Sequence, residues 1–330
     1  MSLITFGEIM MRLTAPGNQR FAQATALNIT YGGGEANVAA ALAQLGMPAA
    51  HVTVVPDNDL GRAAAAFYRK AGVDTGHFQF GSGRLGLYFV EVGASMRPSR
   101  VVYDRYDSAF ARLDPRQFDW EKILAGADWF HWTGITPAIS QAAAEACAEA
   151  IRCARRLGIT VSTDVNYRRV LWQYGKTPAE VMPALVEGCD VAVCSEGDAA
   201  DIFGLQAADF PDMARQLMQR FPHLKKVIAV RRETLSASHN RLTGLCFDGA
   251  RLSESPRFDV NPIVDRIGGG DAFMAGFIYG TRHYADPAEA LAFATAASAL
   301  KHTVEGDLNL VTVAEVEQVM GGDVSGRLLR

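Results

Sequence analysis

Short apolar runs alternate with helical segments through the middle of the chain, between residues 128 and 230. The runs DWFHWTG, ITVSTD (159–164), DVAVC (190–194) and KVIAV (226–230) are predicted strands. Residues 140–157 and 178–187 are predicted helices, and two further short helical segments precede KVIAV. Strands that alternate with helices form parallel sheets, and near-continuous apolar strands are buried on both faces. The pattern therefore predicts a parallel sheet covered by helices.

Several helix ends are marked by capping residues. Helix starts are predicted at Thr177, Asp286 and Thr312, because each is followed three residues later by Glu. In the first two cases Pro also occupies the first helical position. Helix ends are predicted at three glycines, Gly46, Gly72 and Gly158.

The region between residues 81 and 106 has a different pattern. GLYFVEVG and SRVVYDRY alternate apolar with polar residues and are separated by the turn-like segment GASMRPS. Alternation of this kind is typical of half-exposed strands in a hairpin. Together with residues 27–31, the hairpin predicts a small sheet beside the main one, and such a sheet is typical of a lid over a site.

Composition narrows the class of protein. The chain has 330 residues, 49% of them hydrophobic, and a net charge of −4, which argues against nucleic acid as the main partner. The five cysteines form no CxxC pair and the histidines no metal-ligand spacing, so we expect a reducing compartment. No apolar stretch approaches the length of a membrane span. We therefore expect a cytoplasmic protein without a membrane partner.

Polar side chains follow three successive predicted strands. DVNYRR contains Asp164, Asn166 and Arg168, and SEGD contains Ser195, Glu196 and Asp198. Arg231 and Arg232 follow KVIAV. In an open parallel sheet, ligands bind beyond the carboxyl ends of the strands. Simple solvation of strand ends is the alternative, but acid, amide and guanidinium groups after three strands favour a binding site.

Two glycine-rich segments each lead into a predicted helix. YGGGEANVAAALAQLG (31–46) is either a loop that a ligand approaches closely or a tight strand-to-helix turn. In DRIGGGDAF (265–273), consecutive glycines at a helix start let backbone amides converge into an anion hole. Asp271 beside them is either an N-cap or a general base that deprotonates a hydroxyl during phosphoryl transfer.

Three other patterns are weaker. GSGRLG (81–86) matches a dinucleotide fingerprint but leads into a strand, and GKT (175–177) lacks the first glycine of a Walker A loop. The histidines have no partner in the sequence and are expected to be packed or surface residues.

The two glycine segments together resemble the two signatures of the PfkB (ribokinase-like) carbohydrate kinase family. FGEIMMRL, DVNYR and LKHTVEGDLNLV are among the further segments most similar to its 2-keto-3-deoxygluconate kinase branch. The resemblance implies an α/β fold, a ribokinase-like three-layer α/β/α sandwich with a mostly parallel sheet. It implies one kinase domain over residues 1–330, with a β-sheet lid drawn from about 10–32 and 81–107 and a homo-oligomer formed through the lid.

The resemblance also implies ATP-dependent, Mg²⁺-assisted phosphorylation of an acidic keto-deoxy sugar, 2-keto-3-deoxygluconate, to its 6-phosphate. A monovalent cation is a further cofactor in this expectation. The implied catalytic residues are Asp271 as base and Gly268, Gly269 and Gly270 as anion hole. The implied substrate contacts are Gly33, Gly34, Asn37, Tyr88, Tyr103, Arg105, Arg168, Asp271 and Asp307. The implied cofactor contacts are Asn166, Arg168, Ser195, Arg231, Gly268 and Gly270, and Glu196 and Asp198 are expected near the metal, through water.

Some features keep alternatives open. A carboxylate on the substrate would explain why the pocket holds two arginines, Arg105 and Arg168. Alternatively, Arg168 could bind ATP phosphates and Arg105 could be a solvated charge on the lid. Ser195 and Asp198 stand where the family usually has Asn and Glu, and Arg266 stands where a small residue is common. The alternatives are a PfkB-family kinase for a neutral sugar or nucleoside, or a catalytically weak sugar- or nucleotide-binding protein on the same scaffold.

Overall fold

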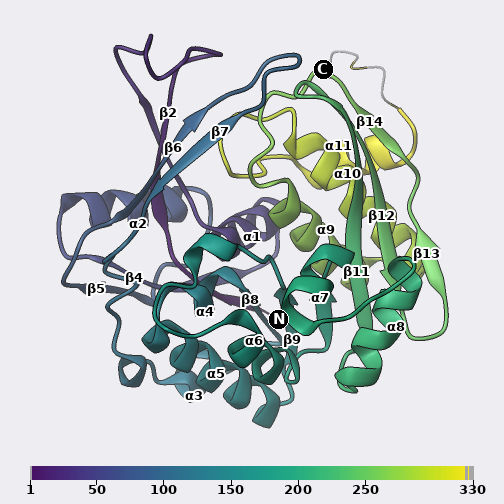
Figure 1. Cartoon of the computed structure of the whole chain (residues 1–330), viewed down its shortest axis with the longest axis horizontal. Helices are drawn as coiled ribbons and strands as arrows, with labels where there is room; N and C mark the ends of the chain where they lie inside the picture. The colour runs from purple at the N-terminus through teal and green to yellow at the C-terminus, as the bar shows by residue number, and fades with distance from the viewer. Residues whose placement is uncertain (1, 324–325, 327–330) are drawn as a thin grey trace.

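A ten-stranded sheet runs through the computed structural model, which describes residues 2–323 and 326 (Figure 1). The strand order is β13-β12-β11-β10-β9-β8-β1-β4-β5, and β14 pairs with β12. Neighbouring strands are parallel from β5 to β11, whereas β12, β13 and β14 are antiparallel to their partners. The strands are β1 (Leu3–Phe6), β4 (Ala49–Pro56), β5 (Phe78–Gly81), β8 (Trp129–Thr133), β9 (Thr160–Asp164), β10 (Val191–Val193), β11 (Lys226–Ser236), β12 (His239–Phe247), β13 (Leu252–Glu254) and β14 (Phe258–Val260). The prediction of a mostly parallel sheet is confirmed.

Strand β11 is longer than its sequence pattern predicts. The apolar run ends at Val230, but the strand continues to Ser236 because β12 pairs with it along that length. Residues 231–235 are exposed, so an apolar run could not mark them as strand. Arg232, which lies in this β11–β12 hairpin, lines the cavity described below.

Helices cover the two faces of the sheet in two separate hydrophobic clusters. One cluster joins α3, α5, α6, α7 and α8, and the other joins α1, α2, α9, α10 and α11. The bounds are α1 (Gly34–Gln44), α2 (Asp59–Lys70), α3 (Trp120–Ile123), α4 (Ile135–Ile139), α5 (Gln141–Arg156), α6 (Pro178–Val186), α7 (Glu196–Phe203), α8 (Phe210–Arg220), α9 (Gly269–His283), α10 (Pro287–Lys301) and α11 (Val313–Met320), with short 3₁₀ turns at Pro115–Gln117 and Arg169–Leu171. The three-layer sandwich is confirmed.

The predicted helix signals are present. Thr177 and Thr312 form capping boxes with the glutamates three residues later, and Asp286 caps α10. Gly46, Gly72 and Gly158 all have the left-handed φ that ends a helix. Helices α9 and α10 pack closely, since a Cβ on Gly276 would lie 2.8 Å from the Cα of Ala294.

A separate four-stranded sheet forms the lid. Its order is β3 (Asn28–Gly32), β2 (Met10–Thr14), β6 (Gly86–Glu91) and β7 (Arg100–Asp104). Figure 1 shows β2, β6 and β7 extending away from the central sheet on one side of the molecule. The predicted hairpin is therefore confirmed as β6 and β7, and β3 lies within the predicted segment 27–31 and one residue beyond it.

The other structural expectations concern cysteines and membrane spans. All five cysteines are buried and free. No helix in the described part of the chain is long and apolar enough to cross a membrane.

Candidate active site

A cavity of about 590 Å³ lies between the lid, the carboxyl ends of β9 and β10 and the middle of β11. It is lined by residues from both glycine-rich segments, from the lid and from the polar strand ends. All the predicted catalytic and substrate residues line it: Gly33, Gly34, Asn37, Tyr88, Tyr103, Arg105, Arg168, Gly268, Gly269, Gly270, Asp271 and Asp307. Asn166, Ser195 and Asp198 line it as well, whereas Arg231 and Glu196 do not.

The glycine segment before α9 leaves backbone amides open to the cavity. Gly268 is the N-cap of α9 and has a left-handed φ of 85°, and a Cβ there would lie 2.0 Å from Asp307 O. The N–H of Gly269 donates to Arg266 O at 3.3 Å, which closes the turn. Within residues 2–323, the N–H groups of Gly270 and Asp271 have no acceptor. Two unpaired amides at a helix N-terminus can stabilise negative charge.

Asp271 is not the N-cap of α9, so one of its two sequence interpretations is excluded. Its carboxylate makes no cap bond to α9 and accepts a 2.7 Å hydrogen bond from Asn37 Nδ2. Burial in the cavity is the largest influence and raises the pKa of Asp271 to about 8, with nearby Asp164 adding to the shift and the Asn37 bond opposing it. A carboxyl group with a pKa near the working pH is suited to general-base catalysis.

A second acidic group lies at the end of β9. Burial raises the pKa of Asp164 to about 7, and the nearby charge of Asp198 raises it further, while Arg168 opposes the shift. Asn166 beside it has a left-handed φ of 39°, and its buried Oδ1 has no hydrogen-bond partner in the described structure. Carboxylates without an ion pair and an unpaired amide oxygen are groups that can supply oxygen ligands to a cation.

The serine and aspartate at the start of α7 cap that helix. Ser195 Oγ donates to Asp198 Oδ2 at 2.6 Å and accepts from the Asp198 N–H at 3.1 Å. The other oxygen, Asp198 Oδ1, accepts from the N–H of Tyr167 at 3.2 Å. Glu196 is exposed and does not line the cavity, so only Asp198 of the predicted metal pair faces it.

Tyrosines and an arginine from the lid face the cavity. Tyr88 and Tyr103 are paired across β6 and β7, with ring centroids 6.0 Å apart in a stacked arrangement. Arg105 is buried and forms an ion pair with Glu8, with Arg105 Nε 2.9 Å from Glu8 Oε2. Arg105 is therefore not the solvated lid charge that one interpretation of the sequence allowed, and its charge is already balanced.

Known proteins resemble this chain over nearly its whole length. The family described as "pfkB family carbohydrate kinase" matches residues 1–313. The chain belongs to the PfkB family of carbohydrate kinases. A 2-dehydro-3-deoxygalactonokinase of Haloferax volcanii is 36% identical over 98% of both chains. The crystal structure of a 2-dehydro-3-deoxygluconokinase of Thermotoga maritima is 40% identical, covers 98% of both chains and superposes with a TM-score of 0.93. Fructokinase-1 of Zea mays, a kinase named for a neutral sugar, is 29% identical over 96% of this chain and 97% of its own.

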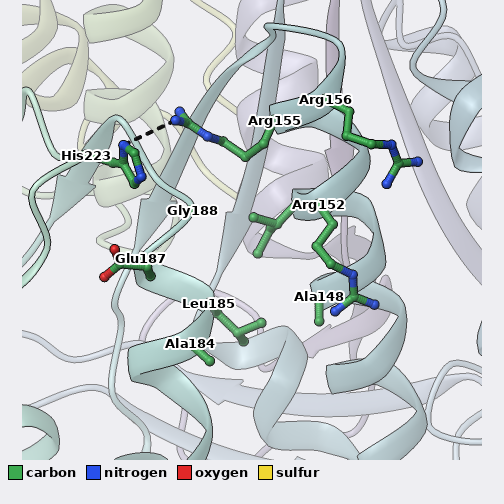
Figure 2. A pocket seen from close by; sticks show the side chains of 10 residues that line it. Ala148, Arg152, Arg155, Arg156, Ala184, Leu185, Glu187, Gly188 and His223 are labelled. Carbon is green, nitrogen blue, oxygen red and sulfur yellow. Dashed lines mark hydrogen bonds between the residues drawn. The ribbon is translucent and has the colours of Figure 1, made fainter.

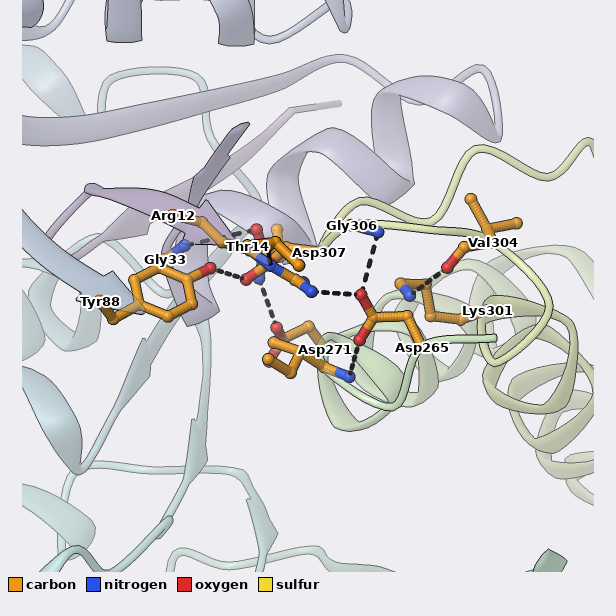
Figure 3. A network of polar contacts seen from close by, with 12 residues as sticks. Arg12, Thr14, Gly33, Tyr88, Asp265, Asp271, Lys301, Val304, Gly306 and Asp307 are labelled. Atoms are coloured by element: carbon orange, nitrogen blue, oxygen red, sulfur yellow. Dashed lines mark hydrogen bonds and ion pairs between the residues drawn. The ribbon is translucent and has the colours of Figure 1, made fainter. Parts of the chain in front are cut away.

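A buried polar network ties the lid of this PfkB kinase to the glycine-rich loop before α9, and sequence reasoning missed most of it (Figure 3). Arg12 on β2 is 1% exposed and bridges two carboxylates, with Nη1 2.8 Å from Asp307 Oδ1 and Nη2 2.5 Å from Asp265 Oδ2. Tyr88 donates to the other oxygen of Asp307 at 2.6 Å. Asp307 lines the cavity as predicted, but both its oxygens are already bonded within the network. The sequence did contain one sign of this network, because Arg12 is the only arginine in the largely apolar segment FGEIMMRL.

Lys301 contributes a further buried charge behind the anion hole. Its side chain is 0% exposed, its Nζ donates to Val304 O at 3.0 Å, and burial lowers its pKa. A Cβ on Gly268 would lie 3.2 Å from Lys301 Cε, so the aliphatic stem packs directly under the loop. The sequence offered no signal for it, because lysine at the end of a helix usually faces water.

At the β11 wall of the cavity, the structure differs from the sequence prediction by a single residue. Arg231 points away from the cavity, and its Nη1 lies 3.6 Å from Glu254 Oε1. Arg232 lines the cavity instead. Adjacent side chains on a strand point to opposite faces, and β11 continues as a strand through both residues.

Proposed function

We propose that this kinase transfers the γ-phosphate of ATP to a hydroxyl of an acidic keto-deoxy sugar, with 2-keto-3-deoxygluconate and its 6-phosphate as first candidates. The observation that carries the proposal is the placement of Asp271. Its carboxylate faces a cavity large enough for a sugar, has a raised pKa, and lies at the helix end with the unpaired amides of Gly270 and Asp271. The names of the relatives described above support the same substrate class.

The residues divide the reaction between them. Asp271 takes the proton of the acceptor hydroxyl as that oxygen attacks the γ-phosphorus, and the oxygen that bridges the β- and γ-phosphates leaves with ADP. Asn37 holds the Asp271 carboxylate in position through its 2.7 Å hydrogen bond. The free amides at the start of α9 stabilise the charge that develops on the phosphoryl group. The lid excludes water, which would otherwise accept that group.

Mg²⁺ is the metal that the family implies, and the cavity residues fit it. Asp164, Asp198 and Asn166 Oδ1 offer oxygen ligands, which Mg²⁺ prefers. Residues 2–323 and 326 contain no group of three or more His, Cys, Asp or Glu that could hold a metal by itself, so we expect these residues to act with water and donor phosphates. When bound, Mg²⁺ neutralises charge on the transferring phosphate. A monovalent-cation requirement stays a prediction, which assays in potassium, sodium and tetramethylammonium salts would test.

An acidic acceptor is supported by Arg168. Its guanidinium lines the cavity and its one hydrogen bond in the described structure is from Nη1 to Tyr167 O, at 2.9 Å. By contrast, Arg105 is already paired with Glu8. A guanidinium without a paired carboxylate binds the carboxylate of a sugar acid through charge-assisted hydrogen bonds.

The test measures ADP formation with ATP and a panel of acceptors that includes the gluco and galacto keto-deoxy acids, fructose, ribose and adenosine. We expect turnover of one or both acids with kcat/KM at least tenfold above the neutral compounds. Arg168→Ala should raise KM for the acid at least tenfold and leave KM for ATP within twofold. The exposed neighbour Arg169, which does not line the cavity, provides the control Arg169→Ala.

Other outcomes would identify other functions. Equal turnover of neutral ketoses would overturn the acidic acceptor and favour a fructokinase or ribokinase activity. A rise in KM for ATP alone in Arg168→Ala would assign that residue to the donor. Wild-type protein that forms no ADP with any acceptor would instead be a sugar- or nucleotide-binding protein on this scaffold.

We also propose a cytoplasmic homo-oligomer formed through the lid. The outer surface of the lid exposes large apolar side chains, among them Ile29, Val102 and Tyr106, which are 59%, 53% and 61% exposed. Such clusters are typical of interfaces between protein chains. Val102→Glu should lower the mass measured by light scattering, whereas Val170→Glu, at an apolar site 62% exposed outside the lid, should not. An unchanged mass in both variants would contradict this interface.

A further inference from the structure

Two groups of arginines line cavities in this kinase, and they differ in how their charges are balanced. A cavity of about 520 Å³ beside α5 and α6 is lined by Arg152, Arg155 and Arg156 (Figure 2). Each of these guanidiniums has a carboxylate within 4 Å: Glu149 for Arg152, Asp190 for Arg155, and Glu121 for Arg156. That group is a surface ion-pair network with no unsatisfied charge.

Two arginines of the active-site cavity have no such balance, unlike Arg105, which is paired with Glu8. Arg232 and Arg266 both line the cavity, and neither forms an ion pair with a carboxylate anywhere in residues 2–323. Arg266 Nη2 donates to Ser236 O at 2.7 Å, which anchors it to the β11–β12 hairpin. The guanidinium of Arg232 donates no hydrogen bond within the same residues. Arg266 lies two positions before Gly268, so the pair adjoins the anion hole.

The two guanidiniums are close enough to repel each other. Arg232 is exposed on the strand, but protein atoms around the cavity desolvate its guanidinium, which lowers its pKa, and the charge of Arg266 lowers it further. The same two charges add to the effect of burial in lowering the pKa of His302, whose ring packs beneath Gly269. Two like charges held together without a counter-ion destabilise the protein when no ligand is bound. An anion bound between them would remove that repulsion.

The two unpaired arginines come from different elements than the acidic groups near β9. Asp164 lies at the end of β9 and Asp198 in the first turn of α7, whereas Arg232 lies on β11 and Arg266 in the loop before α9. Arg168, proposed above for the acceptor, belongs to the segment after β9 and is separate from this pair in the sequence and in the sheet. The side with the two arginines suits an oligophosphate, because planar guanidiniums bind phosphate oxygens in pairs.

We propose that Arg232 and Arg266 bind the phosphate chain of the donor next to the amides at the start of α9, and so select donors with several phosphates. This inference rests on the proposed kinase function for its biological meaning, but it concerns binding alone and can be tested without catalysis. Neither residue is assigned a part in proton transfer. Each holds the donor so that its terminal phosphate faces the acceptor.

The experiment titrates wild-type and variant proteins with ATP, ADP, AMP and inorganic tripolyphosphate by calorimetry, without acceptor. We expect Arg232→Ala to weaken ATP and tripolyphosphate binding at least tenfold and AMP binding by less than threefold. Arg232→Lys should recover part of the loss. The matched control is Arg231→Ala, because Arg231 is the next residue on the same strand, points outside the cavity and pairs with Glu254. Its affinities should stay within twofold of wild type.

Steady-state kinetics of the same variants separates donor from acceptor contacts. Arg232→Ala should raise KM for ATP while KM for the acceptor stays within twofold. Equal affinities in the Ala variants at 231 and 232, or an equal rise in both KM values, would overturn the proposal. Arg266→Ala should behave like Arg232→Ala, with its melting temperature measured because Arg266 also anchors the loop.

The results also distinguish this proposal from the proposed function. Wild-type protein that binds ATP, loses that affinity in Arg232→Ala and phosphorylates no acidic sugar would support the arginine pair and contradict the substrate. Wild-type protein that binds neither ATP nor tripolyphosphate would overturn both.

Discussion

The side-chain amide of Asn37 donates a 2.7 Å hydrogen bond to Asp271 across 234 residues of chain. Asn37 lies in the first turns of α1 and Asp271 in the first turn of α9. The two glycine-rich segments therefore line one cavity, in which Asn37 of the first holds the carboxylate of Asp271, the proposed base, in the second. A hydrogen bond to the charged form of a carboxyl group favours that form, so Asn37 lowers the pKa that burial raises.

Asp271→Asn tests the base directly. We expect kcat to fall on the order of a hundredfold or more, because general-base assistance contributes that much, while the Kd for ATP stays near its wild-type value. The measurements are steady-state turnover with the preferred acceptor and calorimetric ATP binding. Asp201→Asn, on the exposed surface of α7, is the control and should leave both unchanged. Near-normal turnover in Asp271→Asn would remove Asp271 from the base role.

The same substitution should change how stability depends on pH. The pKa of Asp271 is raised from 3.8 to about 8 in the folded protein, so folding favours the protonated carboxyl group. This favourable contribution is complete below pH 3.8 and is lost as pH rises through about 8. Asp271→Asn has no such loss, and we expect it to be more stable than wild type by up to about 5 kcal/mol at pH 8.5, with little difference near pH 4. Thermal melts of both proteins across this range are the measurement, and a pH-independent difference would contradict the raised pKa.

Asn37→Ala should move the pH profile of the reaction. Removal of the hydrogen bond raises the pKa of Asp271, so the acid limb of log kcat/KM should shift to higher pH by on the order of one unit. Gln44→Ala, at the exposed end of the same helix, should leave the profile in place. A fall in kcat/KM of equal size at every pH would instead mean that Asn37 contacts the acceptor without affecting the base.

Arg12→Ala should destabilise the fold strongly. It leaves Asp265 and Asp307 buried without their shared cation, and loss of one partner of a buried ion pair costs about 3 to 5 kcal/mol. Arg62→Ala breaks an exposed ion pair with Asp57 and should cost less than about 1 kcal/mol. Urea unfolding of the two variants gives the comparison. Equal losses would show that the Arg12 network contributes no more than a surface pair.

The elements that the sequence predicted well are those with strong local signals. The strands β8 to β10 are short, near-continuous apolar runs between helices, and the starts of α6, α10 and α11 carry capping residues that act within one turn. Strand β11 was predicted too short, because its exposed part is held by pairing with β12 and not by burial. Pairing between strands is a tertiary property that an apolar run does not encode.

For the site, the sequence determined which groups are present, and the tertiary structure decided which of them are free to react. DRIGGGDAF and YGGGEAN indicated an anion hole, a base and a second loop from residue types alone. Only the folded chain shows that Arg105 is balanced by Glu8, that Asp307 is held by Arg12 and Tyr88, and that Arg232 faces the cavity in place of Arg231. The physical reason is that charge and burial depend on neighbours far apart in the sequence, whereas glycine freedom and helix capping depend on adjacent residues.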